Sequence, residues 1–142
     1  MLSRLAVILA CVSVFAVAAC GDDDAPQPKG DAVTDEEYLK VFCTGIVNYQ
    51  DALLTSKDVA GIAKAVDDYV ATLEPIRPPT DLETFHAAYV GYLKAALKGK
   101  DPTVLVTQKP PVPDDGPRDR LARKSDDVPE CKYPTFLNPP EE

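Results

Sequence analysis

Apolar side chains recur every three or four residues across the segment 34–99, and this spacing predicts helices. In the first stretch the spacings are 3, 4, 3 and 4, at Leu39, Phe42, Ile46, Tyr49 and Leu53. Just before it, Thr34–Glu37 has the pattern of a capping box, in which the threonine and glutamate side chains each bind the other residue's backbone N–H. We therefore predict a helix from this box to about Thr55.

Two more helices follow from the same kind of pattern. The second has its start signal at Ser56–Asp58, and its apolar spacing continues until the prolines of Pro75–Pro79 end it. The third opens with a second capping box, at Thr80–Glu83, and Gly99 is well placed as the residue after its C-cap. Short connections between the three predict an all-α fold, a small three-helix up-down bundle over residues 34–99.

The segment 100–142 has a different character, because it holds nine of the 14 prolines. Gly116–Asp127 has the composition of a polar turn of helix with little to bury besides Leu121. Apolar residues around Cys131 are numerous enough to dock on other parts of the domain. We predict a proline-rich irregular strap that crosses the bundle and is tied to it at Cys131.

The N-terminus has the organisation of a secretory signal. Met1–Arg4 carries one positive charge, and the apolar run Leu5–Ala19 is shorter than the roughly 20 residues that span a bilayer. The run ends in Val17-Ala18-Ala19-Cys20. This resembles the lipobox of bacterial lipoproteins, an aliphatic residue and two small residues before an obligatory cysteine. The resemblance implies a signal peptide over residues 1–19, a diacylglycerol on the Cys20 thiol and often palmitate or another acyl group on the new amino group.

Residues 20–33 begin with a polar stretch rich in Gly, Pro and Asp, which is typical of a flexible tether. Two other interpretations of the N-terminus are open: an ordinary signal peptide cut after Ala16-Val17-Ala18, and an uncleaved anchor. With lipidation, the domain is anchored at the outer face of the cytoplasmic membrane or in the outer membrane.

The cysteine count predicts one disulfide. Cys11 leaves with the signal peptide and Cys20 takes the lipid, so Cys43 and Cys131 form the remaining pair, 88 residues apart. No CxxC motif indicates zinc, redox chemistry or haem attachment. A buried free Cys43 with an incidental Cys131 is the main alternative, and a nucleophilic Cys43 is a weaker one.

Charge and histidine content exclude several classes of protein. The 142 residues fit one domain and carry 15 basic and 23 acidic side chains, a net charge of −8, which disfavours nucleic acid and anionic lipid as partners. The single histidine, His86, excludes a multi-histidine metal site, and no calcium-loop pattern is present. We expect no metal and no cofactor.

His86 is the best candidate for acid–base chemistry. It lies on the apolar stripe of the third helix, with Leu82 and Tyr89 at helical spacing and Glu83 one turn back. A histidine in that position is more often a structural residue at the edge of the core than a general base. We therefore predict no catalytic residues and no enzymatic activity.

Three functional classes remain. The one we favour from the sequence is a non-enzymatic interaction or structural module of the envelope, held by a lipid anchor and contacting an unidentified envelope protein. The alternative is a small-ligand-binding lipoprotein with a tyrosine-lined groove near His86 and Tyr89. An envelope enzyme using His86 is third. The sequence indicates no oligomeric state.

Overall fold

The computed structural model describes residues 30–132, and this part of the chain contains helices and no strands. The elements are α1 (Asp35–Thr55), α2 (Val59–Leu73), η1 (Thr80–Leu82), α3 (Glu83–Lys98), α4 (Val104–Thr107), α5 (Asp115–Ser125) and η2 (Pro129–Cys131). The predicted all-α class is confirmed. The predicted signal peptide, most of the tether including Cys20, and the last ten residues of the strap lie outside the described residues.

Side-chain caps begin the first two helices, as the sequence predicts. The N–H of Glu37 donates to the Thr34 hydroxyl at 3.2 Å, and the N–H of Thr34 donates to the Glu37 carboxylate at 2.9 Å. The capping box of α1 is therefore confirmed. At the start of α2, the Asp58 carboxylate accepts from the N–H of Gly61 at 3.0 Å, so each helix has one of its first free N–H groups satisfied.

The second predicted capping box, at the start of α3, is wrong. Thr80 is already inside the short helix η1, where no side chain caps the first turn. An N-cap residue needs extended backbone, which Thr80 does not have. The N–H of Leu82 donates to the Pro79 carbonyl at 2.8 Å, and the Leu82 side chain is fully buried. Burial of Leu82 thus fixes a tight turn where the pattern predicts a cap.

The other end of α3 also differs from the prediction. Gly99 has φ −70°, an ordinary helical value, whereas Lys100 has φ 58°, in the left-handed region. The N–H of Lys100 donates to the Leu97 carbonyl at 3.0 Å. The helix therefore extends one residue further than predicted, and a lysine takes the position that usually holds glycine.

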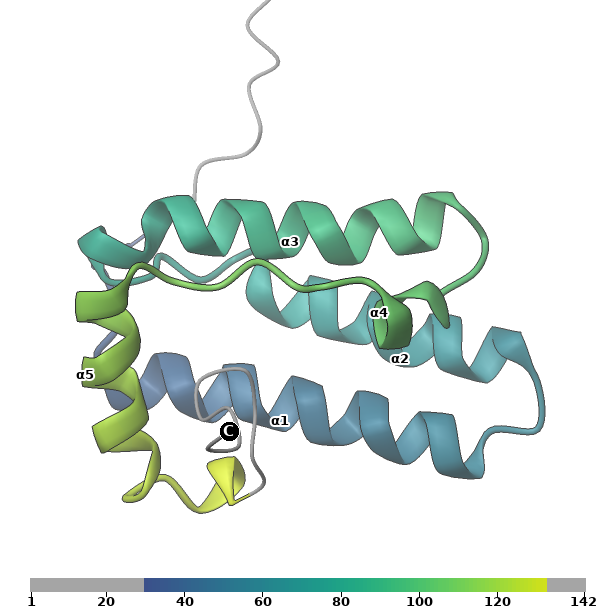
Figure 1. The fold of residues 1–142 in the computed structure, drawn as a ribbon, viewed down its shortest axis with the longest axis horizontal. Coiled ribbons are helices and arrows are strands. Elements are labelled where there is room, and N and C mark those ends of the chain that lie inside the picture. Colours follow the sequence, from purple (N-terminus) through teal and green to yellow (C-terminus); the bar gives the residue numbers. More distant parts are fainter. Residues whose placement is uncertain (1–29, 133–142) are drawn as a thin grey trace, which may run out of the picture.

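Helices α1, α2 and α3 lie side by side and share one hydrophobic core (Figure 1). Its centre is aromatic: the Phe42 ring lies 4.8 Å from that of Tyr89 and 6.1 Å from that of Tyr69, centroid to centroid. The Tyr69 ring covers Gly45, where an added Cβ would come within 2.0 Å of it. The Tyr69 hydroxyl then reaches the Phe42 carbonyl at 2.8 Å. Only glycine at position 45 lets α1 and α2 approach in this way.

The predicted strap contains regular helices instead of being irregular throughout. Helix α5 lies across the end of the bundle where α1 begins (Figure 1). Leu121 on α5 is fully buried in the core, and Val128 joins the same cluster. Most side chains of this helix are polar, so the sequence gives little sign that its one leucine is inserted into the core.

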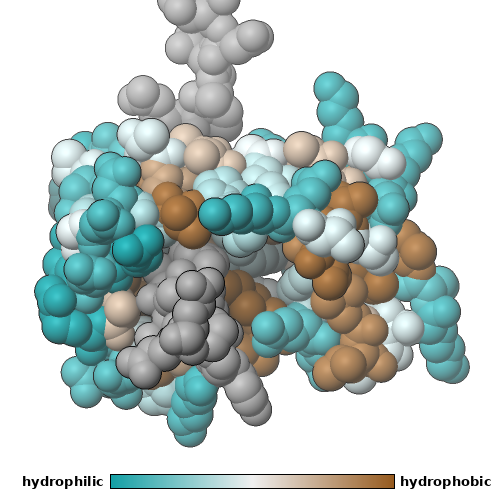
Figure 2. All heavy atoms as spheres, in the orientation of Figure 1, coloured by the Kyte–Doolittle hydropathy of each residue, from teal (hydrophilic) through white to brown (hydrophobic). Residues whose placement is uncertain are grey.

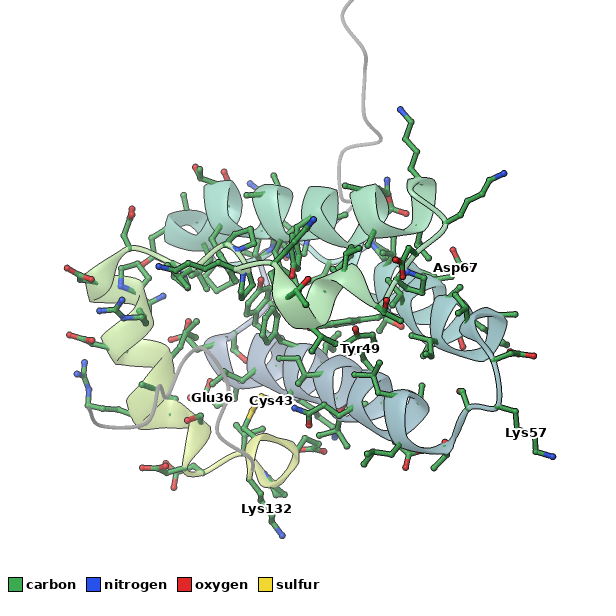
Figure 3. The ribbon with its side chains drawn as sticks, turned by 45° about the vertical axis from the view of Figure 1, so that its right-hand side comes forward. Glu36, Cys43, Tyr49, Lys57, Asp67 and Lys132 are labelled. Atoms are coloured by element: carbon green, nitrogen blue, oxygen red, sulfur yellow. A yellow bond between two sulfur atoms is a disulfide. The ribbon has the colours of Figure 1, made fainter. Side chains whose placement is uncertain are left out.

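A disulfide joins the end of the described chain to α1. Cys43 and Cys131 are bridged, with their Cα atoms 5.1 Å apart, in agreement with the predicted pair. Cys43 itself is buried, and its sulfur lies on the side of α1 that faces η2 (Figure 3). The bridge closes a loop of 88 residues, so it links the last described element to the first helix.

Candidate functional site

A groove of about 320 Å³ lies between α1, α3 and α4 in the described structure, and Tyr69 of α2 contributes to its inner surface. We call it the tyrosine groove, and its lining residues are Ile46, Tyr49, Gln50, Leu53, Tyr69, Tyr89, Tyr92, Leu93, Leu105, Val106 and Pro110. Aliphatic and aromatic side chains dominate this set. A pocket of this size and composition is at the lower end of the range typical of small-molecule sites.

Tyrosine rings from two helices form the inner surface of the groove. Tyr69 and Tyr89 are buried, with ring centroids 6.1 Å apart, and Tyr92 lies 6.0 Å from Tyr89 on the outer side. Burial raises the pKa of Tyr69 and Tyr89 well above the ordinary tyrosine value. Their hydroxyl groups are therefore neutral throughout the physiological pH range.

The remaining side of the groove, which we call the groove wall, is formed by residues 102–110. The Tyr49 hydroxyl donates to the Pro102 carbonyl at 3.1 Å, and Figure 3 shows Tyr49 on α1 directed toward the α4 segment. The Tyr92 hydroxyl lies 3.2 Å from the Leu105 carbonyl and 3.1 Å from the Gln108 carbonyl. Two tyrosines thus hold the backbone of the wall in place.

His86 does not line this groove. It is 8% exposed, and its Nδ1 lies 3.2 Å from the Tyr38 hydroxyl. Burial lowers the pKa of His86, and a hydrogen bond to the Leu73 backbone opposes that shift. The ring is thus a neutral, hydrogen-bonded part of the core. The neighbouring acid, Glu83, is exposed.

Of the two residues expected at a ligand site, the structure brings only Tyr89 into the groove. The helical stripes placed Tyr49, Tyr69 and Tyr92 on faces that turn inward, so they could be suspected from the sequence. Leu105, Val106 and Pro110 could not, because their positions depend on how the segment after α3 folds back. That return is set by hydroxyl-to-carbonyl hydrogen bonds, which leave no periodic signal.

At the opposite end of the domain, an ion-pair cluster holds α5 against the starts of α1 and η1. Arg120 on α5 donates to Asp35 from Nε at 2.9 Å and from Nη2 at 3.2 Å, and its Nη2 donates to Asp81 at 2.9 Å. Lys124 lies 3.1 Å from Asp35 and 2.7 Å from Glu36. Burial alone would raise the pKa of Asp35, but Arg120 and Lys124 hold it below its usual value.

Within residues 30–132, no group of three His, Cys, Asp or Glu side chains is arranged to hold a metal ion. None of the helices described there has the length and apolar character needed to cross a membrane.

Comparison with protein-family models, with curated proteins and with solved structures finds no match.

Proposed function

We propose that this protein is a membrane-anchored lipoprotein of the cell envelope whose small helical domain works by binding and not by catalysis. The anchor is the lipid on Cys20, at the end of the lipobox-like Val17–Cys20. It holds the domain at the outer face of the cytoplasmic membrane or in the outer membrane. The domain is a three-helix up-down bundle of α1, α2 and α3, to which the proline-rich strap is tied.

The tyrosine groove is the observation that supports a small molecule as the ligand. It is concave, largely apolar and built from side chains of four helices, and Tyr49 and Tyr92 hold its wall. Pockets of this kind are where small molecules bind in proteins. The groove therefore supports a small-ligand-binding lipoprotein, with Tyr89 in the site and His86 in the core behind it.

A protein partner in the envelope is the second candidate, and one observation favours it. Leu54 and Val106 are exposed by 87% and 64%. Figure 2 shows hydrophobic side chains gathered over α4 and the C-terminal half of α1, around the groove. Contiguous exposed apolar surface is typical of interaction sites as well as of ligand entrances.

Two measurements test this proposal. The first is membrane fractionation of the Cys20→Ser chain, which we expect to leave the membrane fraction. Unchanged membrane association would contradict a lipid anchor and favour an uncleaved signal.

The second is native mass spectrometry of the protein released from its membranes, which we expect to show a bound small molecule. Val106→Trp narrows the groove and should reduce the bound fraction. Val112→Trp is the matched control, because Val112 is also an exposed valine but does not line the groove. Co-purification of a protein, with equal small-molecule signals in both variants, would favour the second candidate.

A further inference from the structure

The tyrosine groove has no charged side chain in its lining. Its polar groups are four tyrosine hydroxyls and the amide of Gln50, which is exposed at the rim. An ionised ligand entering such a groove loses water without gaining a partner of opposite charge, which is costly. The acidic Asp101 acts on one groove residue, since burial, Tyr92 and Asp101 together raise the pKa of Tyr49. A negatively charged ligand is therefore disfavoured both by its loss of hydration and by the negative charge of Asp101.

Three of the four tyrosine hydroxyls in the groove already donate their protons to backbone carbonyls. Tyr69 donates to the Phe42 carbonyl, Tyr49 to the Pro102 carbonyl and Tyr92 to carbonyls of the groove wall. A hydroxyl has one proton to donate and two lone pairs with which to accept. What Tyr49 and Tyr92 still offer a ligand is therefore an acceptor oxygen, which selects a ligand that donates.

Resting on the proposed small-ligand role, we propose that the groove binds an uncharged amphiphile with an apolar body and a single hydroxyl-type donor. The body lies against the aliphatic side chains, of which Leu53 and Leu93 come from two different helices. The donor faces a tyrosine oxygen or the Gln50 carbonyl at the rim. A volume of about 320 Å³ suits a short alkyl chain or one ring, and excludes a complete two-chain lipid.

Three eight-carbon probes that differ only in their head group test the ligand class: octan-1-ol, octanoate and octylammonium. The protein is the full chain carrying Cys20→Ser, so that no detergent competes for the groove. Binding is followed by calorimetry and by tyrosine fluorescence, since the chain has six Tyr and no Trp. We expect octan-1-ol to bind at least about tenfold more tightly than either ion, because only the ions lose hydration without a partner.

A substitution at the rim should invert this preference. Gln50→Arg places a cation at the mouth of the groove and should strengthen octanoate binding by about tenfold, while octan-1-ol binding changes little. Asn48→Arg is the matched control. It adds the same charge on the same helix, on an exposed residue outside the groove lining.

The outcomes separate the ligand class from the proposed function. Octanoate binding equal to that of octan-1-ol, and lost in Lys109→Gln, would show that a lysine of the groove wall recruits anions and would overturn the neutral class. Tighter octylammonium binding would overturn it as well. In both cases a small-ligand protein remains. If no probe binds and no small molecule co-purifies, the ligand class and the small-ligand role both fail.

Discussion

The two halves of the segment that follows α3 are attached to the bundle in different ways. The groove wall, 102–110, is held by the hydroxyls of Tyr49 and Tyr92 and by the buried Pro102 at its start, and α4 within it contains no buried residue. The second half, α5 with η2, inserts Leu121 into the core, pairs Arg120 with two carboxylates and ends in a disulfide. Both halves belong to the strap that the sequence predicts as one piece.

This difference suggests that the two halves have different roles, one in stability and the other in ligand entry. Burial and a covalent bond resist opening, so α5 and η2 stabilise the fold. Beyond the buried Pro102, the wall is held mainly by part-buried and exposed hydrogen bonds, and it opens at a lower cost, since each such bond contributes about 1 kcal/mol. A ligand entering the tyrosine groove has to displace only the wall, and the rest of the domain is unaffected.

The largest expected effect is the loss of the disulfide. In the double variant Cys43→Ser/Cys131→Ser, we expect the free energy of unfolding to fall by about 4 kcal/mol, because the 88-residue loop no longer restricts the unfolded chain. Urea denaturation measures the loss. Relative to the parent chain, hydrogen exchange should become faster in α5 and η2, and faster exchange confined to the groove wall would contradict the comparison.

The next effect concerns leucines in the two halves. Leu121→Ala should cost about 3 kcal/mol, because the side chain is fully buried and its removal leaves a cavity. Leu105→Ala in α4 should cost about 1 kcal/mol or less, since Leu105 is only partly buried against the core. Thermal unfolding measures the loss of stability in each variant. Equal losses would mean that the wall is as tightly packed as α5.

Arg120→Met tests the ion-pair cluster, keeping most of the side-chain stem. We expect a loss of about 1–2 kcal/mol at neutral pH, because the Asp35 side chain is only 11% exposed and is left without its main partner. The control, Lys64→Met, removes an exposed pair with Asp68 and should change stability by less than about 0.5 kcal/mol.

The cluster also predicts the pH dependence of stability. Arg120 holds the pKa values of Asp35 and Asp81 below the ordinary aspartate value of 3.8. A depressed pKa in the folded state contributes stability that is present above the unfolded value and is lost as the pH falls through the folded one. The difference in the free energy of unfolding between the parent chain and Arg120→Met should therefore be constant above about pH 5 and shrink below pH 4. A difference that persists at pH 2 would contradict the role of the two carboxylates.

Periodicity and caps were enough to predict α1 and α2. The stripe of apolar residues ends at Leu53, close to the end of α1 at Thr55, and Thr34 and Asp58 cap the two helices as expected. Such signals are local, so a single sequence contains them. The placement of His86 in the core fits the same logic, since it lies on the stripe of α3.

What the sequence did not predict depends on contacts between distant residues. Nothing near Leu121 in the sequence shows that the core has a place for it, and nothing near Pro102 shows that its carbonyl will accept a hydrogen bond from the Tyr49 hydroxyl. The groove exists because the chain folds back after α3. The pairing of Cys43 with Cys131 was easier, because only two cysteines of the mature chain were left to pair.

The smallest effect is expected in the turn that leads from α3 into the groove wall. Lys100 has φ 58°, which costs a residue with a Cβ about 1 kcal/mol and costs glycine almost nothing. Lys100→Gly should therefore stabilise the fold by about 0.5 kcal/mol, after the greater entropy of glycine in the unfolded chain is subtracted.

Gly99→Ala is the matched variant for this turn, and it decides which residue is left-handed. Gly99 has a helical φ of −70°, and an added Cβ would lie 3.5 Å from the Ala95 carbonyl oxygen, an ordinary contact. Alanine there should stabilise by about 0.5–1 kcal/mol, because it loses less entropy on folding than glycine. Destabilisation by both substitutions, measured by urea denaturation, would instead place the left-handed residue at Gly99. The groove wall would then leave α3 one residue earlier, and the carbonyls that Tyr49 and Tyr92 hold would have to shift with it.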